Sequence, residues 1–133
     1  MKLINRDTDY AVRALVYLGK NEGKKATITD IVEELDISRA FLRKIMQVLA
    51  KRNIIESYKG NKGGFKLKKS LSDINLIDLI EIFQGGYRLN ECIFNKKICP
   101  NRNTCLLKKK VDLIEDMVKK ELYSINLGSL VAQ

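Results

Sequence analysis

Residues 27–68 read TITDIVEELDISRAFLRKIMQVLAKRNIIESYKGNKGGFKLK, and the first part of this stretch predicts two short helices. Thr27 and Asp30 have the spacing of a capping box, with Asp in place of the stronger Glu, and apolar residues follow on one helix face: Ile31, Val32 and Leu35. After a tight connection over residues 36–38, a second helix has apolar residues at i, i+3, i+4 and i+7: Leu42, Ile45, Met46 and Leu49. This arrangement is typical of a helix-turn-helix.

The other face of the second helix is basic and polar. Ser38 is placed to cap the helix, and the residues that follow on this face are Arg39, Ala40, Arg43, Lys44 and Gln47. A run of charge is usually a solvated face, but a recognition helix presents such a face to the major groove of DNA. We therefore expect these residues, Ser38 included, to bind double-stranded DNA.

A β-hairpin is predicted directly after the two helices. Residues 54–58 and 65–68 have strand character, and between them lies the glycine-rich, lysine-bearing sequence KGNKGG. A nucleotide-binding loop is disfavoured, because Gly64 is followed by Phe65 in a strand-like run and not by a helix. We expect the tip to contact the minor groove or the DNA backbone through Lys59, Asn61 and Lys62. The predicted fold is a winged helix, mainly α with a small β-hairpin wing.

The charge of the chain is concentrated in this same stretch. The net charge is +9, from 25 basic and 16 acidic residues, and residues 39–69 hold ten Lys or Arg against the single acid Glu56. The rest of the chain therefore balances at fifteen against fifteen, so the excess indicates one polyanion-binding face. No apolar run reaches membrane-spanning length and no signal peptide is evident, so we expect a cytoplasmic protein with no membrane partner.

Three further helices are predicted outside this stretch. The first is capped by Asp7 or Thr8 and ends near Gly19, and another begins at Asn75 and is terminated by Gly85. The last is long, and its apolar residues recur at a spacing near 3.5: Leu107, Val111, Ile114, Val118 and Leu122. A seam of this kind packs on another helix, and a second copy of the chain would supply one. We therefore expect a homodimer, which matches the two-fold symmetry of most operators.

The length of 133 residues suits one domain, or one domain with an appendage. We divide the chain into a winged helix-turn-helix DNA-binding domain at 1–74, whose first helix also lies at the dimer interface, and a part with the cysteine loop and the dimerisation helix at 75–133.

Three cysteines lie within fourteen residues, at Cys92, Cys99 and Cys105, in a polar loop. Three unremarkable thiols are the plain interpretation, but packing thiols rarely cluster in a polar loop, and three thiolates suit an iron–sulfur cluster or zinc. Both groups ordinarily take four ligands. Because the chain has no histidine, a fourth protein ligand is expected to be a carboxylate.

The chain resembles the Rrf2 family of bacterial winged-helix transcription regulators. The resemblance runs over nearly the whole sequence and rests on these motifs: Met1–Leu3, Thr8–Leu15 (TDYAVRAL), Ile37-Ser38 with Phe41-Leu42, Lys59-Gly60 with Lys62–Phe65 (KGGF), the three cysteines, and Ile125–Val131 (INLGSLV). It implies a homodimer in which each subunit pairs a winged helix with a dimerisation helix. It also implies a [2Fe–2S] or [4Fe–4S] cluster on the cysteines.

The sequence departs from the family pattern in two places. The first cysteine interval holds six residues where five are expected, and Leu107 and Lys108 stand where the IscR-like members have a histidine ligand. The N-terminal Thr-Asp instead resembles the NsrR-like members, in which an aspartate supplies the fourth ligand across the dimer. The resemblance therefore implies that Asp9 is a ligand, with Asp7 as the alternative; an acid that only stabilises the start of the helix is the competing interpretation.

From these features we predict a transcription regulator of repressor type, not an enzyme. An iron–sulfur cluster that senses iron–sulfur status, nitric oxide or redox state would control its operator affinity. The alternative is a winged-helix regulator that binds no cluster and relies on zinc or thiol chemistry. A small iron–sulfur electron carrier is disfavoured, because it has no need of two groove-reading elements, and a winged-helix RNA-binding protein is a further option.

Overall fold

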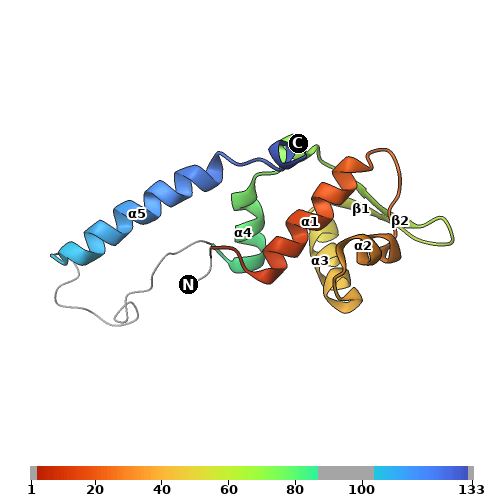
Figure 1. The fold of residues 1–133 in the computed structure, drawn as a ribbon, viewed down its shortest axis with the longest axis horizontal. Coiled ribbons are helices and arrows are strands. Elements are labelled where there is room, and N and C mark those ends of the chain that lie inside the picture. The colour runs from red at the N-terminus through yellow and green to blue at the C-terminus, as the bar shows by residue number, and fades with distance from the viewer. Residues whose placement is uncertain (1–2, 87–103, 132–133) are drawn as a thin grey trace.

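The computed structural model describes residues 3–86 and 104–131 and is a winged helix followed by a long helix (Figure 1). The elements, in chain order, are α1 (Arg6–Lys20), α2 (Ile28–Leu35), α3 (Arg39–Lys51), β1 (Ile55–Tyr58), β2 (Gly64–Leu67), η1 (Leu71–Asp73), α4 (Leu76–Gln84), α5 (Leu106–Tyr123) and η2 (Leu127–Leu130). The predicted fold class is confirmed. None of the helices in the described ranges is long and apolar enough to cross a membrane.

The core lies where α1, α2 and α3 meet the base of the wing. The four apolar positions predicted for α3 are all buried, and they pack with side chains from the neighbouring elements, among them Leu15, Ile31 and Ile55. Burying a side chain of this size contributes roughly 1.5–3 kcal/mol, so this face of α3 fixes which side of the helix remains exposed.

The predicted starts of α2 and α4 are confirmed, and that of α1 is wrong. The capping box of α2 is present, because Thr27 Oγ1 accepts from the Asp30 backbone N–H at 3.1 Å and Asp30 accepts from the Thr27 N–H at 2.9 Å. The cap of α1 is neither Asp7 nor Thr8 but Asn5, whose side chain accepts from the Thr8 N–H at 2.9 Å. Thr8 has another role: it is fully buried, and its hydroxyl donates to Gln84 Oε1 at 2.7 Å.

The wing is the predicted two-stranded hairpin, with one isolated bridge added on the outer edge of β2. Strands β1 and β2 pair antiparallel, with Ile55 opposite Leu67 and Tyr58 opposite Gly64. On the other edge of β2, Ala26 bridges to Phe65 through two backbone hydrogen bonds of 3.1 and 2.8 Å. The connection between α1 and α2 is thereby fastened to the wing.

The segment after residue 74 joins the same core. Leu79 of α4 and Leu127 of η2 are fully buried in it, and the Leu127 N–H donates to the Ile74 carbonyl at 2.9 Å. One hydrophobic core therefore spans the boundary that was predicted between 1–74 and 75–133. The assignment of different functions to these two parts stays a prediction.

Helix α5 extends away from the winged helix, and its N-terminal end and the loop of the wing lie at opposite ends of the molecule (Figure 1). Of the predicted seam, Leu122 is buried at the C-terminal end of α5, where it packs with α4. The large apolar residues of α5 with more than half of their surface exposed are Leu106, Leu107, Leu113, Ile114, Met117 and Tyr123.

Candidate nucleic-acid interface and cluster ligands

The face of α3 opposite the core carries the residues predicted to bind DNA. All six of them are exposed: Ser38, Arg39, Ala40, Arg43, Lys44 and Gln47. Ser38 occupies the N-cap position, but its side chain makes no capping hydrogen bond. The hydroxyl at the start of α3 is therefore available to a ligand outside the helix.

The two arginines on this face differ in how they are held. Arg39 Nη2 donates to Thr29 Oγ1 of α2 at 3.0 Å, so the guanidinium of Arg39 extends from α3 toward α2. Within the described residues, Arg43 makes no hydrogen bond or salt bridge. Arg43 consequently keeps all of its donors for base edges, which a guanidinium can contact through two hydrogen bonds at once.

The loop of the wing holds its lysines outward on a tight backbone. Lys59, Asn61 and Lys62 are exposed, Gly60 has a φ of +95°, and the Gly63 N–H donates to the Gly60 carbonyl at 2.9 Å. A Cβ on Gly63 would lie 2.5 Å from the Tyr58 carbonyl oxygen, so no side chain fits there. The glycines therefore keep the loop compact.

Lys25 lies in the connection between α1 and α2 and contacts the wing, which the sequence did not predict. Its Nζ donates to the Lys62 carbonyl at 3.3 Å and lies 4.2 Å from the centre of the Tyr58 ring. The Tyr58 hydroxyl donates to Glu56 at 3.0 Å, and this hydrogen bond is the main cause that raises the pKa of Tyr58 above its ordinary value. The ring therefore stays neutral at physiological pH. Lys25 and Lys62 are 37 residues apart, and no local pattern signals that contact.

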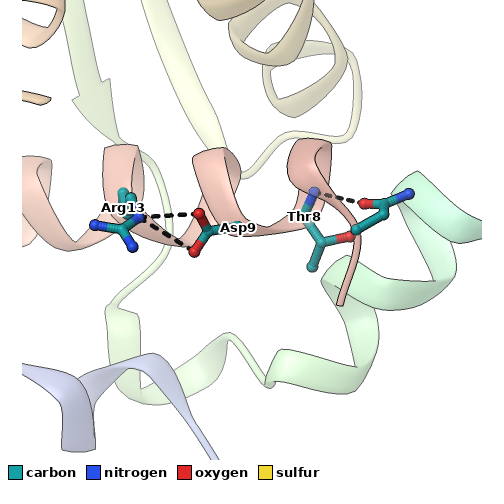
Figure 2. Close-up of polar contacts among 4 residues, drawn as sticks. Thr8, Asp9 and Arg13 are labelled. Atoms are coloured by element: carbon teal, nitrogen blue, oxygen red, sulfur yellow. Dashed lines mark hydrogen bonds and ion pairs between the residues drawn. The ribbon is translucent and has the colours of Figure 1, made fainter. Parts of the chain in front are cut away.

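Asp9 lies on the outer side of the first turn of α1. Its carboxylate accepts from Arg13 Nε at 3.0 and 3.1 Å, and 45% of the Asp9 side-chain surface is exposed (Figure 2). It also lines a hollow of about 340 Å³ between α1, the end of α2 and η2. A carboxylate in an exposed pair can exchange its partner for another ligand at low cost, since such pairs contribute only about 0–1 kcal/mol.

Cys105 is the one predicted thiol ligand inside the described residues, because Cys92 and Cys99 fall in the undescribed range 87–103. Cys105 occupies the N-cap position of α5 and is partly exposed, so an incoming ligand can reach its sulfur. The described part of the chain contains no group of three or more Cys, Asp or Glu side chains poised around one point. The N-terminal end of α5 is directed away from α1 (Figure 1).

The chain is similar in sequence to known transcriptional regulators. Residues 4–133 match the profile of the Rrf2 family, which is described as an iron-dependent transcriptional regulator. The HTH-type transcriptional regulator NsrR of Oceanobacillus iheyensis is 32% identical over 134 aligned positions, which cover 89% of this chain and 90% of that protein.

Two solved structures share the fold. CymR, the global cysteine regulator of B. subtilis, superposes with a TM-score of 0.82 at 22% identity, over 99% of this chain and 98% of that one. The IscR of T. potens gives a TM-score of 0.76 at 21% identity, over 98% and 86% of the two chains.

Proposed function

The chain belongs to the Rrf2 family and is therefore a DNA-binding transcriptional regulator rather than an enzyme, and we propose that an iron–sulfur cluster controls its operator affinity. In this proposal the protein is a bacterial, cytoplasmic homodimer of repressor type. The cluster, [2Fe–2S] or [4Fe–4S], is held by Cys92, Cys99 and Cys105 together with Asp9. The signal is iron–sulfur status, nitric oxide or redox state.

The donor chemistry is the observation that carries the cluster proposal. Three thiolates suit an iron–sulfur cluster, and the absence of histidine leaves a carboxylate as the natural fourth protein donor. Asp9 supports this role, because within the described residues its carboxylate is bound only by the exposed Arg13 and is open to solvent. When bound, the cluster would supply iron sites that join the segments carrying these four side chains.

Dimerisation is supported by the exposed side of α5. Its apolar residues recur at a spacing near 3.5, and a monomer would leave Leu107, Ile114 and Met117 in water. Because the N-terminal end of α5 is directed away from α1 (Figure 1), a four-ligand site is most simply completed between two copies, with Asp9 supplied by the other subunit.

The DNA contacts divide into two kinds in this proposal. Arg39, Arg43 and the other exposed residues of α3 read base edges in the major groove. Lys59, Asn61 and Lys62 at the tip of the wing contact backbone phosphates or the minor groove. The first set determines sequence preference, and the second contributes affinity for any duplex.

The second candidate is a regulator that binds no cluster. The same thiolates also suit zinc, and the partly exposed Cys105 sulfur is open to oxidation. Both candidates share the DNA-binding surface and differ only in what the cysteines hold.

Spectra and binding measurements on anaerobically purified protein test the proposal. We expect visible charge-transfer absorption with bound iron and acid-labile sulfide. We also expect the operator affinities of holo and apo dimers, compared at one salt concentration, to differ about 5- to 150-fold, the usual range of allosteric coupling. Colourless protein with bound zinc would favour the second candidate. Equal affinities on every candidate operator would contradict cluster control and leave DNA binding intact.

A further inference from the structure

A row of lysines follows the outer edge of β2, on the side where the connection between α1 and α2 lies. We call it the wing edge, and it consists of Lys24, Lys25, Lys66, Lys68 and Lys69. The last three belong to the basic stretch 39–69, and Lys24 and Lys25 lie outside that stretch. The fold brings the two groups together, because Ala26 is bridged to Phe65.

The part of the wing edge nearest the base of the wing is a basic hollow. It measures about 290 Å³, and its lysines are Lys24, Lys66, Lys68 and Lys69, with Glu22 as its only acid. Within the described ranges none of these lysines forms a salt bridge, and their side chains make one hydrogen bond, a long one of 3.4 Å from Lys68 Nζ to Asn53 Oδ1. Four lysines and one glutamate leave the hollow with an excess of three positive charges.

The hollow is continuous with the tip of the wing. Lys25 follows Lys24 directly, and its Nζ reaches the Lys62 carbonyl in the loop at 3.3 Å. A path of positive charge therefore runs from Lys62 along the outer edge to Lys69. Strand β2 (Gly64–Leu67) covers about 13 Å of this path at 3.3 Å per residue, and DNA places one phosphate per strand about every 3.4 Å along its axis. The strand part of the path is therefore as long as about four base pairs.

We infer that the wing edge is a second DNA contact, which binds backbone phosphates of operator DNA outside the base pairs that α3 reads. The inference rests on the proposed placement of α3 and the wing on the operator. Continuity with the wing tip favours this occupant, because a duplex that touches Lys62 can continue along the same edge. The contact is made to phosphate, so it adds affinity and footprint length without adding sequence preference.

The test uses two charge-matched double variants and two duplexes. Lys68→Gln with Lys69→Gln removes two charges from the wing edge, and the control, Lys109→Gln with Lys120→Gln, removes two from exposed positions of α5. One duplex holds only the operator core, and the other is extended by about one helical turn, roughly 10 base pairs, on each side. Affinity is measured against salt concentration with the cluster state held constant.

We expect the wing-edge variant to bind the long duplex more weakly, with a salt slope lower by about 1.8 per subunit, and to bind the core duplex like the unaltered protein. The control should match the unaltered protein on both duplexes. Equal losses on both lengths would place the contact inside the core and overturn the inference, and so would no loss on either.

Arg43→Ala separates this inference from the proposed DNA placement. If Arg43→Ala lowers operator preference while the wing-edge variant changes nothing, the wing-edge inference alone fails. If neither variant changes binding, the proposed placement on DNA fails as well.

Discussion

Helices α3 and α5 carry apolar faces of similar regularity, but only α3 buries its face within the chain. Leu42 and Met46 on α3 are completely buried, whereas Ile114 and Met117 on α5 are 53% and 67% exposed. Helix α3 packs against α1, α2 and β1, and α5 touches the chain mainly at Leu122. Periodicity thus predicts an apolar face in both helices, but it does not say whether the partner of that face lies in the same molecule.

The two helices also differ in what their exposed surfaces offer. The exposed face of α3 is basic and polar, which suits a partner that carries negative charge and hydrogen-bonding groups. The exposed face of α5 is apolar, which suits a second protein surface. We therefore expect a negatively charged partner for the exposed face of α3 and a protein partner for that of α5, and substitutions on each face can test this.

The largest expected effect concerns α5. Ile114→Gln should dissociate the dimer, because both copies lose the burial of one large side chain, about 1.5–3 kcal/mol each and so roughly 3–6 kcal/mol per dimer. Sedimentation over a range of protein concentrations measures the change. Lys109→Gln is the matched control, since it places the same residue on an exposed position of the same helix that lies off the apolar seam. A dimer equally stable in both variants would show that the exposed side of α5 has a different partner.

The core of the winged helix should respond to substitution next most strongly. Leu42→Ala should lower the free energy of unfolding by about 2–5 kcal/mol, the usual cost of emptying a fully buried leucine site. The variant is best made in the Ile114→Gln protein, so that dimerisation does not enter the measurement by urea unfolding. Leu107→Ala in the same background should change stability by less than about 0.5 kcal/mol, because Leu107 is exposed there. Similar losses at the two positions would remove the difference between α3 and α5.

The sequence was sufficient to predict the parts of the fold that local patterns determine. The apolar face of α3, the capping box at Thr27 and the hairpin of the wing follow from spacing alone, and the structure confirms all three. The cap of α1 was assigned wrongly because Asn5, Asp7 and Thr8 all suit the start of a helix. Thr8 is removed from that role by Gln84, which lies 76 residues away in the chain.

The candidate site was predictable in its exposed residues and not in its long-range contacts. The basic residues of α3 and the wing tip could be read from the sequence, because one helix or hairpin holds each set. The approach of Lys25 to Lys62 and the gathering of the wing edge depend on the bridge between Ala26 and Phe65, which only the tertiary fold makes. Of the predicted cysteine ligands, Cys105 is described, and Cys92 and Cys99 lie outside the described residues.

The exposed face of α3 should show a smaller, sequence-dependent effect. Arg43→Ala should cost about 1–3 kcal/mol on the specific operator and little on random DNA, because a guanidinium that contacts a base edge discriminates between base pairs. Lys62→Ala should weaken binding to all duplexes and lower the salt slope by about 0.9 per subunit. Titrations of both variants on specific and random duplexes measure the difference. If the two variants lost affinity in the same proportion on both duplexes, the division between α3 and the wing would be wrong.

The smallest expected effect on stability is at Asp9. Substitutions there test whether a cluster joins α1 to the cysteine segment that precedes α5. Asp9→Ala removes an exposed pair with Arg13, so the free energy of unfolding of the apo protein should change by no more than about 1 kcal/mol. Asp7→Ala is the control, because Asp7 lies in the same turn and its substitution loses the same favourable interaction with the helix dipole.

A ligand role for Asp9 predicts that Asp9→Ala, and not Asp7→Ala, yields a cluster that decays faster and a smaller difference in operator affinity between holo and apo protein. Decay of the visible absorption and operator titrations supply the two measurements. An Asp9→Ala protein with the unaltered spectrum and decay rate would exclude Asp9, and the same behaviour shifted to Asp7→Ala would assign the ligand to Asp7. Either outcome would be separate from a folding defect, because both side chains lie outside the buried core that supports α1.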